Sequence, residues 1–140
     1  MLGNYRRILT PVDESQQADH MFKKAIAIAK RNEAEIFLVH VTDTRYESLS
    51  PEHSLVDYTD FDTTFLVEKE KLGQEAEVTI RTFIVQGNPK EIIAQQFPKE
   101  QQIDLIVIGA TGKGAINRAL VGSVSSYVIK HATTDVLVVR

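Results

Sequence analysis

Glycine and serine residues with a capacity for anion binding gather in one stretch of the chain. The candidates in this stretch, residues 109–125, are three of its four glycines and its two serines: Gly109, Gly112, Gly122, Ser123 and Ser125. Glycine lets a backbone approach a ligand closely and adopt positive φ angles. A Gly-Ser pair at the start of a helix presents unpaired N–H groups and a hydroxyl at the positive end of the helix dipole. The chemistry that this pattern favours is the binding of phosphate groups.

The stretch lies between a predicted strand and a predicted helix. Residues 103–108 (IDLIVI) are apolar, rich in β-branched side chains and followed by glycine, which is typical of a strand buried on both faces. After the stretch, one helix face is predicted by the spacing i, i+3, i+4, i+7 of Val124, Tyr127, Val128 and His131. Tyr127 and Val128 are expected to be core residues.

Two well-known phosphate motifs do not fit this stretch. The P-loop pattern requires a glycine five residues before Gly112, where the chain has Val107. The dinucleotide pattern G-x-G-x-x-G, begun at Gly112, meets Asn117 in place of its third glycine. The spacing that does fit is G-x2-G-x9-G-[ST], from Gly109 to Ser123.

On this spacing the chain resembles the universal stress protein family, and specifically its ATP-binding branch. Four blocks carry the resemblance in the same order along the chain: residues 7–13 (RILTPVD), 38–41 (LVHV), 104–109 (DLIVIG) and the run from 122 to 139. The resemblance therefore covers nearly the whole sequence.

The resemblance implies a role for each matched position. Pro11, Val12 and Asp13 would line the base and ribose, and Val41 would offer main-chain groups to the adenine edge. The implied phosphate-binding segment acts through backbone N–H and hydroxyl groups and comprises Ile108, Gly109, Gly112, Gly122, Ser123, Val124 and Ser125. The residues by themselves also allow simpler roles: Asp13 or Ser15 would cap the first helix, with Gln16 three residues after Asp13 as in a capping box, and Ser123 would cap the last helix.

The sequence offers few ligands for a metal ion and no catalytic triad of a hydrolase. Nucleotide-binding members of the family often hold a divalent cation, Mg²⁺ or Mn²⁺, on the phosphates. This chain offers no carboxylate pair there, so water would supply most ligands of such a cation. The four histidines lack ligand spacing and the chain has no cysteine, which argues against a zinc site. His40 is expected to be a satisfied core histidine, and no His-Asp set is placed to activate the serines.

Strand and helix patterns alternate along the chain and predict an α/β fold. Strands are expected at residues 5–12, 35–41, 77–85, 103–108 and 136–140, and helices at 13–31, 60–74, 88–98 and after Gly122. Pro98 is expected to end the third helix, and residues 42–58 to form a loop that folds over the nucleotide.

The long crossovers predict an open five-stranded parallel sheet with helices on both faces, Rossmann-like. Periodicity leaves the orders 3-2-1-4-5 and 2-1-3-4-5 open. The resemblance implies 3-2-1-4-5, as in the adenine nucleotide alpha-hydrolase-like folds, and a ligand at the ends of strands one and four.

Length and composition limit the class of protein. The 140 residues suit one domain, 1–140, and the net charge of −3 argues against a nucleic-acid partner. The lack of cysteine, of a signal core and of a run of about 20 apolar residues favours a soluble, cytoplasmic protein. The last strand, 136–140, would be an apolar sheet edge. Family members pair this edge across a two-fold axis, so a homodimer is expected.

The leading hypothesis is a regulatory protein of stress adaptation that binds ATP or AMP. An alternative is an enzyme of phosphoryl or nucleotidyl transfer. Such an enzyme needs positioned cations and a base. The proposed site offers only serines, Asp13 and two basic residues, Lys113 and Arg118, whose charges are expected to be solvated, so at most slow ATP hydrolysis is expected. A further alternative is a dimerisation module that binds no nucleotide, against which the intact glycine spacing argues.

Overall fold

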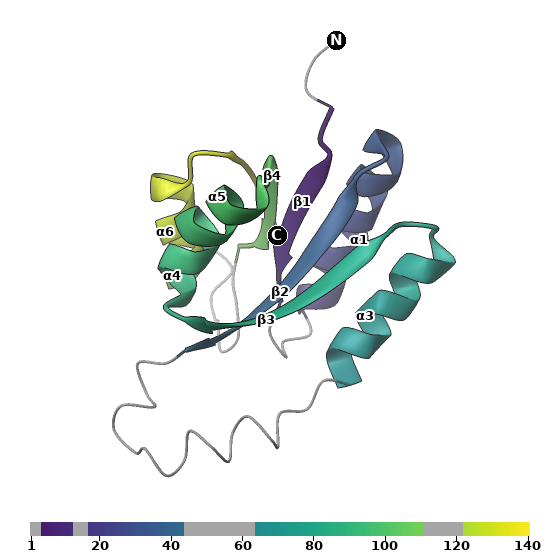
Figure 1. Ribbon diagram of the computed structural model, residues 1–140, viewed down its shortest axis with the longest axis horizontal. Coiled ribbons are helices and arrows are strands. Elements are labelled where there is room, and N and C mark those ends of the chain that lie inside the picture. Colours follow the sequence, from purple (N-terminus) through teal and green to yellow (C-terminus); the bar gives the residue numbers. More distant parts are fainter. Residues whose placement is uncertain (1–3, 13–16, 44–63, 111–121) are drawn as a thin grey trace.

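The computed structural model describes residues 4–12, 17–43, 64–110 and 122–140. Its centre is a 5-stranded parallel sheet in the order β3-β2-β1-β4-β5 (Figure 1). The strands are β1 (Arg7–Pro11), β2 (Glu35–Asp43), β3 (Ile80–Gly87), β4 (Leu105–Gly109) and β5 (Asp135–Val139). The order implied by the family resemblance is confirmed, and the alternative 2-1-3-4-5 is excluded.

Helices cover both faces of the sheet, as predicted. On one face lie α1 (Gln17–Asn32) and α3 (Thr64–Glu75) (Figure 1). On the other lie α4 (Pro89–Glu91), the π-helical turn η2 (Ile92–Gln96), α5 (Phe97–Gln101) and α6 (Ser123–His131). In the described part of the chain, no helix combines the length and the apolar character that crossing a membrane requires.

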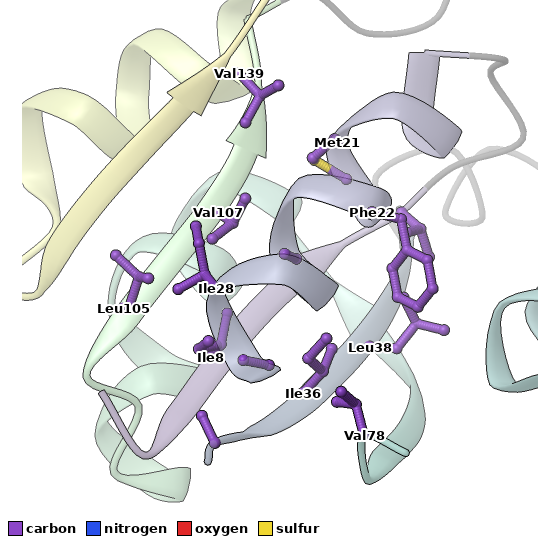
Figure 2. Packing of buried hydrophobic residues seen from close by; sticks show 14 of the residues in the cluster. Ile8, Met21, Phe22, Ile28, Ile36, Leu38, Val78, Leu105, Val107 and Val139 are labelled. Carbon is purple, nitrogen blue, oxygen red and sulfur yellow. The ribbon is translucent and has the colours of Figure 1, made fainter. Parts of the chain in front are cut away.

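The sheet separates the buried apolar side chains into two clusters. Alternate residues of a strand point to opposite faces, so Ile8 and Leu9 of β1 belong to different clusters. The first cluster lies beneath α1 and includes Phe22, Leu38 and Val107 (Figure 2). The second cluster contains residues of η2, α5 and α6. Burial on both faces explains why the strands read as continuous apolar runs.

Local signals set the start of α4 where the sequence predicted it. The Asn88 side chain accepts a hydrogen bond from the Lys90 N–H at 3.1 Å, and Pro89 occupies the first turn. Asn and Pro suit these two positions because the first N–H groups of a helix lack intrahelical acceptors. The preceding Gly87 has φ of 143°, a conformation open mainly to glycine.

Pro98 does not end this helix, contrary to the prediction. The helix passes through Pro98 and continues to Gln101, where Gln102 stops it in the left-handed conformation with φ of 55°. The cause is the π turn before the proline, in which the Phe97 N–H donates to the Ile92 carbonyl, five residues back. A proline ring collides with the carbonyl four residues earlier in a regular α-helix. The wider turn avoids that collision.

Several element boundaries also differ from the sequence prediction. β2 extends into the expected loop, because Thr42 pairs with Gln86 and Asp43 with Gly87. β3 begins at Ile80 rather than residue 77, where Glu77 has φ of 61°. The rest of the expected 42–58 loop, and the first residues of the helix expected at 60–74, lie outside the described residues.

Candidate functional site

The carboxyl ends of β1 and β4 lie side by side at the centre of the sheet. These strands are parallel and paired, with Ile8 opposite Leu105 and Leu9 opposite Ile106. From β1 the chain passes to α1 on one face, and from β4 to α6 on the other. Strand ends at a reversal of this kind are where α/β proteins bind ligands. Continued along both strands, this register brings Pro11 opposite Ile108 at one edge of the sheet.

The N-terminus of α6 has no side-chain cap. Gly122 is the N-cap residue, its N–H donates to the Ala110 carbonyl at 2.7 Å, and its carbonyl accepts from the Ser126 N–H at 2.8 Å. The N–H groups of the next residues, 123–125, have no intrahelical acceptor. No acceptor for them occurs among the residues that the structure describes. These three N–H groups form the positive end of the helix dipole, which is an arrangement suited to binding an anion.

Ser125 links this helix to the end of β4. Its side chain is buried, and its hydroxyl donates to the Gly109 carbonyl at 2.5 Å. The only proton of the hydroxyl is therefore engaged within the protein. The donor that Ser125 retains for an anion is its backbone N–H. By contrast, Ser123 is exposed, and Val124 is half-buried against the second cluster.

Gly109 and Gly122 do not use the positive φ that glycine permits. Gly122 has φ of −61° and ψ of 161°, which other residues adopt freely. Among the described glycines only Gly87 has a positive φ, so Gly109 ends β4 without one. What glycine contributes at positions 109 and 122 is the absence of a side chain. Gly112 and Asp13 lie outside the described residues.

The carboxyl ends of β1 and β2 present main-chain groups. Pro11 is half-buried and Val12 is buried, with its N–H donating to the Val39 carbonyl at 2.9 Å. Because backbone groups alternate in direction along a strand, those of Val41 point to the same side as those of Val39, toward β1. The last β1–β2 pair is Pro11 with Val39. Within the described ranges, neither backbone group of Val41 has a partner on that side.

Two observations concern charged side chains of the described residues. No three His, Asp or Glu side chains within the described residues are close enough to hold a metal ion. A hydrogen bond to Asp135, at 2.8 Å, raises the pKa of Tyr5, but Asp135 begins β5 at the opposite end of the sheet. The groups that the described part of the site offers to an anion are the backbone N–H groups at the start of α6.

Two contributors to this site were missed by sequence reasoning. The carbonyl of Ala110 fixes Gly122, and the His40 ring contacts the carbonyl of Val12, Nδ1 to oxygen 3.2 Å. His40 has a partner, as expected of a satisfied histidine, but it is half-buried and does not belong to the core. Its place in the matched block 38–41 could have indicated a role at the strand end.

Known proteins share this fold and much of this sequence. The sequence pattern of the universal stress protein family matches residues 4–140. A Staphylococcus haemolyticus protein named as a universal stress protein is 40% identical over 141 residues, which cover 97% of this chain and 85% of the relative. The solved structure of the universal stress protein UspA from Lactobacillus plantarum has a TM-score of 0.84 at 31% identity, with 99% of each chain covered. A universal stress protein solved in complex with cAMP has the same fold, with a TM-score of 0.71, 24% identity, and 99% of this chain and 98% of that chain covered. The chain belongs to the universal stress protein family.

Proposed function

We propose that this universal stress protein binds an adenine nucleotide, ATP or AMP, at the carboxyl ends of β1 and β4, and acts as a regulator in stress adaptation. The observation that carries the proposal is the uncapped N-terminus of α6, with the N–H groups of residues 123–125 unpaired among the described residues. A phosphate group offers the acceptors that these donors lack. The family relative solved with cAMP also supports the proposal.

The two sides of the proposed site, β4 with α6 and β1 with β2, would hold different parts of the nucleotide. The phosphates would lie against Gly109, Gly122 and the first turn of α6, which together with Ile108 and Gly112 form the phosphate side. The base and ribose would lie against Pro11, Val12 and Asp13, with the free backbone groups of Val41 at the adenine edge. A divalent cation, Mg²⁺ or Mn²⁺, would be held by phosphate oxygens and water, because the described residues offer it no carboxylate cluster.

The proposed assembly is a homodimer through β5. This strand is the last in the sheet order, and its residues Val136, Leu137 and Val138 remain partly exposed. An edge strand with apolar side chains tends to be covered by a partner. We place the dimer in the cytoplasm, as the family membership and the lack of cysteine suggest. A monomer by light scattering at tens of micromolar would contradict the dimer.

Isothermal titration with ATP, AMP and GTP tests the binding proposal. The decisive variant is Gly122→Val. Valine adopts the φ and ψ of Gly122 without strain, but its branched side chain adds bulk at the N-terminus of α6, where the phosphate would bind. Loss of one hydrogen bond to a charged group costs about 1.5–3 kcal/mol, so ATP affinity should fall at least about tenfold. The control is Thr133→Val, an exposed change beyond the other end of α6, which should bind ATP like the parent.

The other outcomes separate the alternatives. No heat with any adenine nucleotide, at concentrations well above micromolar, would eliminate the proposal and leave a dimerisation module. Equal ATP affinity in the parent and Gly122→Val would show that the phosphates bind elsewhere. Product analysis over hours would reveal ATP turnover and favour an enzyme.

A further inference from the structure

The carbonyl of Val12 has an unusual partner for a backbone group at the end of a sheet strand. The Nδ1 atom of His40, from the neighbouring strand, lies 3.2 Å from this oxygen. The N–H of Val12 makes the expected sheet contact with the Val39 carbonyl, at 2.9 Å. Both backbone groups of Val12 thus contact β2, the N–H through a backbone carbonyl and the carbonyl through a side chain.

The imidazole replaces the next hydrogen bond of the β1–β2 ladder. In a parallel ladder, a residue whose N–H donates to position j−1 accepts at its carbonyl from the N–H of position j+1. For Val12 these positions are Val39 and Val41. The first bond is present, but across the described residues the second is not formed, and His40 occupies the acceptor instead.

The nature of the contact depends on which ring nitrogen of His40 carries the proton. A carbonyl oxygen only accepts, so the contact is a hydrogen bond when Nδ1 of His40 is protonated. The ring is also held edge-on against Phe65 of α3, with centroids 5.7 Å apart and planes at 74°. The helix α3 therefore fixes the ring in the orientation that reaches Val12.

We propose that His40 is a positioning residue for the nucleotide base: by binding the Val12 carbonyl it ends the β1–β2 ladder and leaves the backbone of Val41 open to an adenine edge. Without the imidazole, the Val12 carbonyl accepts a hydrogen bond from the Val41 N–H. The β1–β2 ladder is then one bond longer, and this N–H is no longer available to the base. The inference rests on the proposed nucleotide site, but its structural half can be measured without a ligand.

The ligand-free test compares the parent with His40→Leu and His40→Asn. The Asn side chain places an N–H donor at the position of Nδ1, whereas Leu has no donor. In the parent, ¹⁵N NMR should show His40 protonated at Nδ1, and the Val41 amide should exchange with solvent faster than the Val39 amide. In His40→Leu the Val41 amide should become protected by about tenfold or more, and in His40→Asn it should exchange as in the parent. A neutral ring protonated at Nε2, or equal Val41 exchange in all three proteins, would overturn the inference.

The binding test uses the ratio of ATP to GTP affinity in the same three proteins. Because a backbone hydrogen bond to the base distinguishes adenine from guanine, His40→Leu should lose about fivefold in ATP affinity while GTP affinity stays unchanged, and His40→Asn should restore the parent ratio. An equal loss for both nucleotides would indicate a merely structural role and overturn the proposal. If the parent binds no nucleotide, the proposed function fails, and the exchange of the Val41 amide still decides whether His40 ends the ladder.

Discussion

Thr10 carries a hydroxyl that the fold leaves without a partner. The residue is 0% exposed, and among the described residues no group makes a hydrogen bond with its Oγ1 atom. Its neighbours on the same face of β1, Ile8 and Val12, belong to the apolar cluster beneath α1. A buried hydroxyl without a hydrogen bond costs about 1–3 kcal/mol.

We therefore expect Thr10→Val to raise the free energy of unfolding by about 1–2 kcal/mol. Valine has the same branched shape, keeps the preference for a strand, and places a methyl group where the hydroxyl lacks a partner. The entropy of unfolding near 60 °C is about 2.1 cal/mol/K per residue. For 140 residues the expected gain then corresponds to a Tm increase of about 3 to 7 °C.

Urea unfolding, followed by circular dichroism, measures the change in free energy, and a thermal scan measures the Tm. The control is Thr10→Ser, which keeps the hydroxyl and deletes the methyl group, and which should lose about 1 kcal/mol. The slope of the free energy against urea should be the same in all three proteins. A Thr10→Val protein no more stable than the parent would show that the hydroxyl has a partner in solution, such as a buried water, and would refute the reasoning.

Three further changes test other parts of the fold. Gly87→Ala should lose about 1–3 kcal/mol in urea unfolding, because φ is 143° and a Cβ would lie 2.6 Å from Ile92; an unchanged midpoint would contradict this. Asp104→Ala should lose about 1–2 kcal/mol, since this carboxylate accepts two backbone N–H groups at the start of β1, at 2.9 and 3.1 Å; Asp104→Asn should lose less. Tyr5→Phe should lower the Tm below pH 10 but not well above it, because Asp135 raises the pKa of Tyr5 and the hydrogen bond disappears as the phenol ionises; a pH-independent difference would argue against the bond.

The sequence was informative where a local signal and the fold agree. The run at 103–108 predicted a buried strand, and β4 is buried on both faces, although it begins two residues later, at Leu105. Asn88 and Pro89 predicted a helix start because both act within one turn of the chain. The strand order depended on the family resemblance, since hydrophobic periodicity does not record which strands are neighbours.

The sequence was misleading where distant contacts or a local distortion decide. Pro98 is a helix breaker by local chemistry, but the π turn before it adapts the helix to its ring. The link between His40 and Val12 joins residues 28 positions apart, and the hydroxyl of Ser125 reaches a carbonyl 16 positions away. Such partners are set by the register of neighbouring strands and by the docking of α6, which no single stretch of sequence specifies.

The two apolar clusters share no residue, because the sheet stands between them. Mutational effects add when sites have no common neighbours, and they couple when side chains touch. A substitution beneath α1 is thus compensated by changes on that face, and one beneath α6 by changes on the other. The two faces of the sheet can therefore accumulate substitutions independently during evolution. Residues on the α1 face can change while the N-terminus of α6, at Gly122, stays the same.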